Sequence, residues 1–454
     1  MKGRQNLTVA IATLGCKVNQ YESAAFVSRF QEDGVEVVAF SQKADIYVVN
    51  SCAVTGKAAA QSRQMIRRAL RQNPEARIVV TGCYAQIASQ DVLEMADQPL
   101  CIVGNENKHM LVEIALSDRL CDLEIYMGDI SKKREICDLP VRRFAGRTRA
   151  YLKIQDGCNS FCSYCVVPFA RGRVRSLAPD KVVEQAAVFS QEGYREIVLT
   201  GIHVGMYGLD LGPGHGLVPL LQTLAGRAFS TRFRISSLEP NEVSRDLLNL
   251  MVSCDQIVPH LHLPLQSGDD ATLRRMNRTY GASQFAEVVA MVREALPSAA
   301  IGIDLMAGFP GEDERAFAAT VDLVERLDIG YLHAFPFSKR PGTLAETMAG
   351  QVSREEKERR VAILADLDHK KRTAFYSRQV GTVRQVLAEG SRNQFRLMKG
   401  FSENYVPVHF QAPAEVTNQV VPVRIDRVMD RSVFGTLVLP AKGTGDGPQG
   451  RLFP

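Results

Sequence analysis

The stretch YLKIQDGCNSFCSYC, residues 151–165, decides the fold of the chain's central part. A strand-like run ends at Gly157, and three cysteines follow within the eight residues CNSFCSYC, with no fourth close behind. Thiolates are soft ligands that suit zinc or iron–sulfur clusters. Structural zinc sites take four protein ligands, and a cluster that only carries electrons normally takes four cysteines. The CxxxCxxC spacing therefore favours a 4Fe–4S cluster with one open iron corner over a zinc or purely structural site.

The composition is that of an ordinary globular protein with several domains. The chain has 454 residues, 45% hydrophobic and 23% charged, and a net charge of +5 that permits an anionic partner. No run of 18 apolar residues occurs and the first residues lack the apolar core of a signal peptide, so we expect no membrane span and a cytoplasmic location. Ten cysteines in such a chain indicate metal binding or catalysis rather than disulfides.

The first third of the chain alternates short apolar runs with helical patterns. Over residues 1–130 this alternation predicts an α/β domain built on a doubly wound parallel sheet. Residues 131–149, SKKREICDLPVRRFAGRTR, hold seven basic and two acidic residues. We interpret this segment as a solvated basic linker, and a linker that lies along nucleic acid phosphates is the alternative.

The remaining two thirds contain a second α/β region and then a change of pattern. Residues 150–352 show six strand–helix steps, which predict an open or partial (β/α) barrel. Residues 353–379 form one long charged helix, with a capping box at Ser353 and Glu356. Residues 380–440 are short β-type runs that predict a small β-barrel, and the Gly/Pro-rich residues 441–454 are predicted to be disordered.

Three cysteines that are far apart in sequence share one context. Cys16, Cys52 and Cys83 each follow a short apolar run, VAIATLG, DIYVVNS and RIVVTG. The carboxyl ends of parallel strands meet at one edge of a sheet, where ligands bind. We therefore predict that these thiols converge on a second cluster, with three unrelated buried thiols as the alternative. The other four cysteines are interpreted as structural: Cys101, Cys121, Cys137 and Cys254.

The cysteine motifs resemble a known family. CxxxCxxC with Tyr164 before its last cysteine resembles the signature of radical S-adenosylmethionine (SAM) enzymes, in which the amino and carboxylate groups of SAM occupy the open iron. The series TLGCKVNQYES, NSCAVT, GCYAQ, CNSFCSYCVVPFARGRVRS, RISSLEP and GIDLMAGFPGE resembles the methylthiotransferases over roughly residues 7–440. That resemblance implies an N-terminal cluster domain, a radical SAM partial barrel, a C-terminal TRAM domain and two 4Fe–4S clusters. The cluster ligands would be Cys158, Cys162 and Cys165, and Cys16, Cys52 and Cys83.

The resemblance also implies a reaction and its partners. Lys17-Val18-Asn19-Gln20 and residues 398–410 look like the branch that adds a methylthio group to carbon 2 of N6-threonylcarbamoyladenosine next to the tRNA anticodon. In this family the N-terminal cluster holds the sulfur, one SAM methylates it, and a second SAM is cleaved to a 5′-deoxyadenosyl radical. The implied partners are tRNA, SAM and an electron donor such as flavodoxin or ferredoxin. An aromatic C–H bond has no acidic proton, which gives a chemical reason for radical rather than acid–base machinery.

Further binding residues are assigned by position. Thr200, Gly201 and Glu239 lie at predicted strand ends of the barrel, where active sites gather, and with Tyr164 they are candidates for binding SAM. Capping of a helix is the alternative for Glu239. Basic residues beside aromatics suit RNA phosphates and bases, whereas surface solvation or core packing is the alternative. The candidates for RNA contact are Arg171, Arg173, Arg175, Arg392, Arg396, Lys399 and Tyr405.

Two other functions are weighed against this one. A related branch modifies an aspartate of a ribosomal protein, and Lys17-Val18-Asn19 disfavours it. The second alternative is a non-enzymatic iron–sulfur protein that binds RNA or carries electrons. Such a protein would form no 5′-deoxyadenosine from SAM, which separates it from an enzyme.

Overall fold

The computed structural model describes residues 7–95, 100–117, 123–392 and 397–438. The chain divides into two compact units, Met1–Phe375 and Tyr376–Pro454. The first unit contains two α/β regions, and the second contains the small barrel. In the described part of the chain, no helix is long and apolar enough to cross a lipid bilayer.

The N-terminal region is an α/β sheet in which every strand runs parallel to its neighbours. Within the described residues the strand order is β2-β1-β3-β4-β5-β6. Val48 of β3 packs into the core shared with α1 and α5, whereas Val49 packs into the core shared with α2. Helices thus cover both faces, which confirms the predicted doubly wound sheet and explains the continuous apolar strands. The elements are β1 (Thr8–Thr13), α1 (Lys17–Glu32), β2 (Glu36–Val38), β3 (Ile46–Ser51), α2 (Gly56–Gln72), β4 (Arg77–Gly82), α3 (Cys83–Ile87), α4 (Ser89–Leu93), β5 (Leu100–Val103), η2 (Asn105–Met110), α5 (Leu111–Leu116) and β6 (Leu123–Tyr126).

The edge strand β6 was missing from the prediction. Its four residues, LEIY, alternate apolar with polar or aromatic side chains over too short a run to stand out in the sequence. It pairs in parallel with β5, and this pairing extends the sheet beyond LCIVGN.

The basic segment 131–149 is packed against the protein at several points. Leu139, Val141 and Phe144 are buried in the main core. The Val141 N–H donates to Gln185 Oε1 at 3.0 Å, and the Phe144 N–H donates to the Tyr194 hydroxyl at 2.8 Å. The description as a solvated linker therefore fits only its charged side chains, because every few residues an apolar side chain anchors the backbone.

The central region is an open barrel of parallel strands. Within the described residues, the strands form two parallel sheets, of order β11-β10-β7 and β12-β13-β14. An isolated parallel bridge pairs Phe233 of β11 with Ile257, which lies just before β12, and so connects the two sheets. The six predicted strands are all present, which confirms the partial barrel. The elements are β7 (Ala150–Lys153), β8 (Gln155–Asp156), α6 (Val167–Arg171), β9 (Arg175–Ser176), α7 (Pro179–Gln191), β10 (Glu196–Thr200), α8 (Leu217–Ala225), β11 (Arg232–Ile235), α9 (Arg245–Ser253), β12 (His260–Gln266), α10 (Asp270–Arg275), α11 (Ala282–Ala295), β13 (Ala300–Ala307), α12 (Glu314–Arg326), β14 (Tyr331–Pro336), α13 (Leu344–Thr347) and α14 (Arg354–Ser377).

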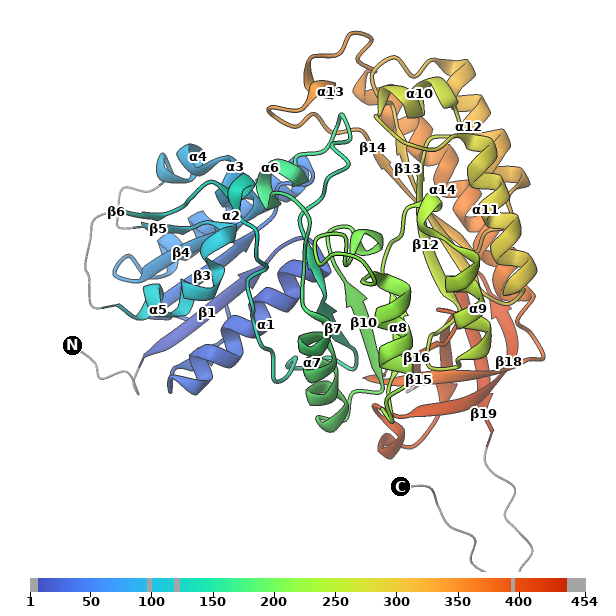
Figure 1. Ribbon diagram of the computed structural model, residues 1–454, viewed down its shortest axis with the longest axis horizontal. Coiled ribbons are helices and arrows are strands. Elements are labelled where there is room, and N and C mark those ends of the chain that lie inside the picture. The colour runs from blue at the N-terminus through green and yellow to red at the C-terminus, as the bar shows by residue number, and fades with distance from the viewer. Residues whose placement is uncertain (1–6, 96–99, 118–122, 393–396, 439–454) are drawn as a thin grey trace, which may run out of the picture. The chain divides into compact units, whose positions relative to one another are not determined.

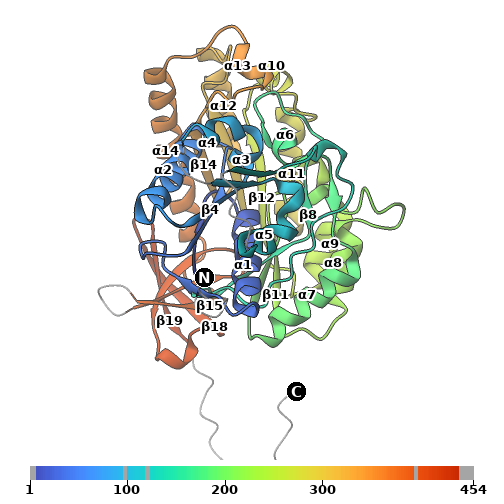
Figure 2. The same ribbon diagram turned by 90° about the vertical axis from the view of Figure 1, so that its left-hand side faces the viewer.

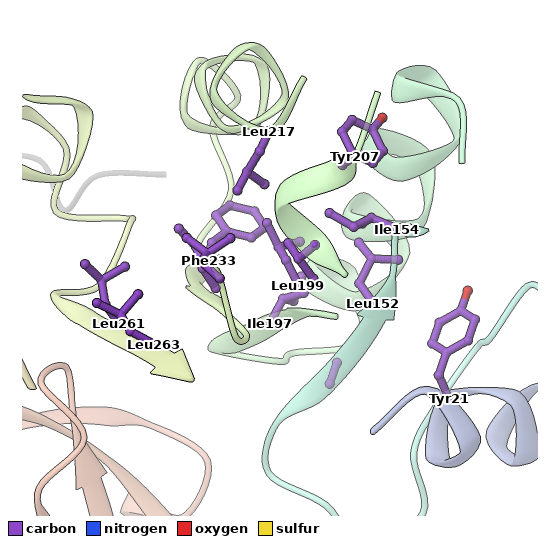
Figure 3. Packing of buried hydrophobic residues seen from close by; sticks show 14 of the residues in the cluster. Tyr21, Leu152, Ile154, Ile197, Leu199, Tyr207, Leu217, Phe233, Leu261 and Leu263 are labelled. Atoms are coloured by element: carbon purple, nitrogen blue, oxygen red, sulfur yellow. The ribbon is translucent and has the colours of Figure 1, made fainter. Parts of the chain in front are cut away.

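A shared core joins the two α/β regions. Figure 3 shows Tyr21 of α1 on the side of the barrel where Leu152 and Ile154 lie. Ile197 and Leu199 of β10 belong to the same buried cluster. The N-terminal sheet and the barrel therefore form one folded unit, in which α1 lies against β7.

The long helix α14 is capped by Ser353. The Oγ atom of this serine accepts a hydrogen bond from the Glu356 N–H at 3.2 Å.

The second unit is a closed barrel. Its strand order is β15-β16-β17-β19-β18, which matches the predicted small β-barrel. Apolar residues such as Val386, Val408 and Val423 fill its interior. The predicted disordered tail, 441–454, lies outside the described residues. The strands are β15 (Val383–Arg392), β16 (Met398–Ser402), β17 (Pro407–Gln411), β18 (Val420–Met429) and β19 (Ser432–Leu437).

Candidate active site

The three cysteines of the N-terminal region follow neighbouring strands. Cys16 stands at the N-cap of α1 after β1, Cys52 follows β3, and Cys83 opens α3 directly after β4. Because β1, β3 and β4 are adjacent and parallel, their carboxyl ends share one edge of the sheet. The structure therefore brings the three thiols together at that edge.

The loops that carry these cysteines are tightly packed. Gly15 has a φ of +87°, and a Cβ atom there would lie 2.6 Å from Cys52 Sγ. Burial, followed by the neighbouring Cys83 thiol, raises the pKa of Cys52 to about 11. Thiols in such surroundings become thiolates when a cation is bound to them, which is the condition a metal cluster provides.

A buried charge network lies beside this site and was missed by the sequence analysis. The fully buried Arg171 of α6 donates from Nε to Cys83 Sγ at 3.4 Å and from Nη1 to Glu22 Oε1 at 2.6 Å. Lys108 also pairs with Glu22, and Lys153 lies 3.4 Å from both Glu22 and Asp156.

The network carries more positive than negative charge. Among the described residues that its ion pairs join, four are formal cations and two are carboxylates: Lys108, Lys153, Arg171 and Arg175, and Glu22 and Asp156. Burial lowers the pKa of Lys108 and so weakens its charge, but three cations still face two carboxylates. Buried charge is costly unless it is balanced, so an anionic group nearby would stabilise this network. Thiolates around an iron–sulfur cluster satisfy that requirement, and the residues present therefore fit such a group.

The CxxxCxxC loop follows β8 and bends sharply around its sulfurs. A Cβ atom at Gly157, whose φ is +74°, would lie 1.9 Å from the Arg173 carbonyl oxygen, so only glycine fits there. The Ser160 N–H donates to Cys158 Sγ and the Val167 N–H donates to Cys165 Sγ, both at 3.4 Å. The contact at Cys158 favours its thiolate, whereas burial outweighs the Val167 contact and raises the pKa of Cys165 to about 12.

His203 lies at this loop as a hydrogen-bonding residue. Its Nδ1 is 3.4 Å from Cys158 Sγ, and its Nε2 is 2.7 Å from Glu242 Oε1. Although burial opposes ionisation of the Cys158 thiol, the contact with His203 lowers the pKa of that thiol. These contacts give His203 the geometry of a hydrogen-bonded residue between the cysteine loop and Glu242.

Arg278 is a second residue that sequence analysis missed. Its Nη1 donates to Cys162 Sγ at 3.2 Å and to the Tyr164 hydroxyl at 3.5 Å, and its Nη2 pairs with Glu239. The guanidinium also lies 4.9 Å over the ring of Tyr280. Arg278 follows α10 in the stretch RRMNRTYG, where nothing but its charge distinguishes it from its neighbours.

The candidates for binding SAM lie around the same loop. Tyr164 is half-buried and meets the ring of Phe309 edge-on at 6.4 Å between centroids. Thr200 is the buried last residue of β10, and a Cβ atom at Gly201 would lie 2.7 Å from Gln155 Oε1. Glu239 pairs with Arg278, and its N–H donates to Glu242 Oε2 at 2.9 Å at the start of a short 3-10 turn. Pairing with Arg278 and helix capping thus occur together at Glu239.

The basic run at 171–175 does not lie on one surface. Arg171 and Arg175 are buried, and Asp156 faces both guanidinium groups, so neither is available to a nucleic acid phosphate. Arg173 is exposed and lies 5.0 Å over the ring of Phe161. A surface cavity of about 550 Å³ is lined by Arg173 together with Asn159 and, from the basic segment, Arg134. Within this run, Arg173 alone remains a candidate for contact with phosphate.

The RNA candidates of the second unit form a small cation–aromatic group. Lys399 Nζ lies 5.2 Å over the ring of Phe401, which stacks on Tyr405 at 5.1 Å between centroids. Arg392 ends β15, and the predicted contact residue Arg396 lies outside the described residues.

The remaining cysteines and histidines build no further site in the described part of the chain. There, no group of three or more His, Cys, Asp or Glu side chains is placed to hold a single metal ion. Cys101 is buried inside β5, Cys254 follows α9, and Cys137 Sγ contacts backbone oxygens of η2. Cys121 lies outside the described residues.

The comparisons with known proteins agree with this architecture. Residues 8–104 match the uncharacterised protein family UPF0004, and residues 152–324 match the radical SAM superfamily. The chain is 38% identical over 422 residues to the threonylcarbamoyladenosine tRNA methylthiotransferase MtaB of Bacillus subtilis, covering 92% of this chain and 93% of that protein. This chain belongs to the methylthiotransferase family of radical SAM proteins. The protein of the same name from Aquifex aeolicus is 38% identical over 413 residues, covering 90% of this chain and 98% of that protein.

A solved structure shares the fold of a large part of the chain. It is the radical SAM methyltransferase TsrM from Kitasatospora setae, with tryptophan and a SAM analogue bound in that protein. The TM-score is 0.55 at 14% identity, over 86% of this chain and 80% of that one. At this identity the similarity concerns the fold alone, and it confirms the radical SAM architecture of this methylthiotransferase.

Proposed function

We propose that this methylthiotransferase adds a methylthio group to carbon 2 of N6-threonylcarbamoyladenosine next to the tRNA anticodon, by radical SAM chemistry. The observation that carries the proposal is the presence of two separate three-cysteine sites in one folded unit, at Cys16/Cys52/Cys83 and at Cys158/Cys162/Cys165. The full-length similarity to curated MtaB proteins supports the threonylcarbamoyladenosine branch over the ribosomal-protein branch.

Each three-cysteine site would hold one 4Fe–4S cluster. When bound, the clusters supply one electron for the reductive cleavage of SAM and the sulfur that is transferred. The protein contributes positions: Gly157 allows the tight cysteine loop, and Arg278 and Arg171 each donate a hydrogen bond to a sulfur of one site. Three thiolates per site leave one iron corner for SAM or for the transferred sulfur.

The residues around the CxxxCxxC loop would bind and orient SAM. Thr200 and Gly201 lie at the carboxyl end of β10, where ligands of parallel strands gather, and Tyr164 packs beside the cysteine loop. Glu239 offers a carboxylate to the amino or ribose groups of SAM, with Arg278 holding its orientation. The apolar contact between Tyr164 and Phe309 helps to exclude water from a reactive radical.

The RNA would be held by charge and stacking. In the small barrel, Lys399, Phe401 and Tyr405 combine a cation with two stacked rings, the pattern that suits RNA backbone and bases. Arg173 would contact phosphate near the cysteine loop, and Arg392 and Arg396 are kept as further candidates on sequence grounds.

The domain limits and cellular context are part of the proposal. The functional regions would be the cluster domain 1–130, the basic segment 131–149, the radical barrel 150–352, the helix 353–379, the RNA-binding TRAM domain 380–440 and the tail 441–454. The enzyme would act in the cytoplasm, and a small electron carrier such as flavodoxin or ferredoxin would reduce the clusters.

Nucleoside mass analysis tests the function directly. tRNA from cells with the gene should contain 2-methylthio-N6-threonylcarbamoyladenosine, and tRNA from cells without it should contain the unthiolated nucleoside. Loss of a methylthio group from a dimethylallyl-type adenosine instead would assign the chain to the other tRNA branch. Purified, reduced protein should also form 5′-deoxyadenosine from SAM, and well-loaded protein that forms none would be the non-enzymatic iron–sulfur protein.

A further inference from the structure

The short helix α6 contacts one sulfur from each cysteine site. Its first residue, Val167, donates its N–H to Cys165 Sγ at 3.4 Å, and its last residue, Arg171, donates Nε–H to Cys83 Sγ at 3.4 Å. Ala170 packs in the core that contains Cys83. Figures 1 and 2 both show α6 beside α3 of the N-terminal region, although α6 belongs to the barrel chain segment.

Arg171 is also linked to the loops of the other two N-terminal cysteines. Its Nη2 donates to Asn19 Oδ1 at 2.5 Å. The Asn19 Nδ2 in turn donates to the Leu14 carbonyl at 2.7 Å and to the Ser51 carbonyl at 3.0 Å. These carbonyls stand just before Cys16 and Cys52 in the sequence. One guanidinium therefore reaches all three cysteine loops, one directly and two through Asn19.

Carboxylates from both α/β regions hold this guanidinium in place. Glu22 comes from α1, and Asp156 comes from β8 immediately before the CxxxCxxC loop. Nη1 lies 2.6 Å from Glu22 Oε1 and 3.2 Å from Asp156 Oδ2. Since Arg171 is fully buried, its orientation is fixed by these contacts and by packing rather than by solvent.

We propose that Arg171 is a positioning residue that fixes the Cys16/Cys52/Cys83 site against the radical site and raises the reduction potential of the cluster bound there. The inference rests on the proposed function, because it requires an iron–sulfur cluster at these cysteines. Reduction adds a negative charge to a cluster, and a buried cation with an N–H aimed at a ligand sulfur stabilises that charge. Hydrogen bonds to sulfur and local net charge are known determinants of cluster potentials.

The test isolates the N-terminal site in the full-length chain. The background protein carries Cys158→Ala, Cys162→Ala and Cys165→Ala, so that only the other three cysteines can hold iron. Arg171→Gln and Arg171→Lys are made in this background. The matched control is Arg29→Gln, which removes an exposed cation from α1, the helix that carries Asn19 and Glu22. Iron per chain and the midpoint potential are measured, the latter by titration with dithionite followed by electron paramagnetic resonance.

The expected result is a graded fall in potential. At a fixed solution potential, the reduced-to-oxidised ratio of the cluster should fall about tenfold in Arg171→Gln, which corresponds to about 59 mV for one electron. Arg171→Lys keeps the charge but loses the planar fork, so it should fall less. Arg29→Gln should keep the background potential, because its charge is screened by water.

Different outcomes separate this inference from the proposed function. If the background protein binds no cluster, the cluster assignment at Cys16/Cys52/Cys83 fails and the inference is overturned with it. If it binds a cluster and both Arg171 variants keep its potential, the inference alone is overturned. Where Arg171→Gln does not fold, Arg171→Lys decides: a lowered potential supports the inference and an unchanged potential overturns it.

Discussion

Glu196 offers a stability prediction whose size follows from its surroundings. Its side chain is fully buried at the start of β10 and accepts from Arg232 Nε and Arg234 Nε, each at 2.8 Å. Although burial alone would raise the pKa of this carboxyl, the two arginines lower it from 4.5 to about 2. A folded-state pKa below the unfolded one means that the ionised form stabilises the fold above about pH 4.5, and that this contribution is lost as the pH falls toward 2.

The magnitude can be worked from that shift. Each pKa unit corresponds to about 1.4 kcal/mol, so the full contribution of Glu196 is about 3 kcal/mol. As the pH falls from 7, protonation of Glu196 in the unfolded chain removes about 1 kcal/mol of this contribution by pH 4 and about 2 kcal/mol by pH 3. Glu196→Gln cannot titrate, so the stability advantage of the parent over this variant should shrink by these amounts.

The assay is urea unfolding of the iron-free protein followed by circular dichroism at pH 7, 4 and 3. Iron-free protein is used so that acid does not release a bound cluster during the measurement. Other buried carboxylates, such as Asp156, titrate equally in the parent and in Glu196→Gln, and their effects cancel in the difference. A difference in unfolding free energy that stays constant from pH 7 to pH 3 would refute the assignment of Glu196 as an ionised, arginine-bound group.

Three further predictions concern the buried charge network, the Cys16/Cys52/Cys83 site and the cation–aromatic group of the small barrel. Glu22→Gln leaves buried cations without their carboxylate and should lower the unfolding free energy by about 3–5 kcal/mol. The control Glu36→Gln, at an exposed position, should change it by about 0.5 kcal/mol or less, and equal urea midpoints for the two variants would contradict the buried network. Gly15→Ala and Gly146→Ala both place alanine at a positive φ, but only Gly15→Ala crowds a cysteine, Cys52. Bound iron per chain should therefore fall by about half in Gly15→Ala alone, and equal iron in the two variants would argue against a cluster at Cys16/Cys52/Cys83. The plot of log affinity for tRNA against log salt has a negative slope, and Lys399→Ala should make that slope less steep by about 1. An unchanged slope would remove Lys399 from the phosphate contacts.

The positions of the six cysteines in the fold follow from short sequence patterns. CxxxCxxC is contained in one loop, and Cys16, Cys52 and Cys83 each sit at the end of an apolar run, so parallel strand geometry alone brings them to one edge. The same reasoning predicts the strands of the barrel. The packing of the basic segment was missed because Leu139, Val141 and Phe144 are spaced too irregularly among its charges to indicate a buried face.

The charged residues at the site could not be predicted in this way. Arg171 and Glu22 are 149 positions apart and pair only after two regions have folded together. In the run ARGRVRS, burial alternates between neighbouring arginines, and their identical chemistry hides which one faces solvent. Arg278 likewise depends on the barrel to bring it to Cys162. Long-range ion pairs leave no periodic signal, so residue type and spacing cannot reveal them.

The two cysteine sites share one electrostatic arrangement, and this bears on how the chain works. At each site one guanidinium donates to one sulfur and is held by a carboxylate from another element: Arg171 by Glu22 at Cys83, and Arg278 by Glu239 at Cys162. The difference lies in what each arginine joins. Arg278 and its partners all belong to the barrel region. Arg171 comes from the barrel region and pairs there with Asp156, but it also contacts Cys83, Glu22 and Asn19 of the N-terminal region.

An N-terminal region without α6 would therefore lack the cation that contacts its own cysteines. Glu22 would lose the partner that Arg171 provides, and the Cys83 sulfur would lose its hydrogen-bond donor. The hydrogen bonds and ion pairs around Cys16, Cys52 and Cys83 are thus completed by the region that carries the CxxxCxxC loop. This contact gives a physical reason why both sites occur in one folded unit: the hydrogen bond from Arg171 to the Cys83 sulfur forms only when α6 is folded beside the N-terminal region.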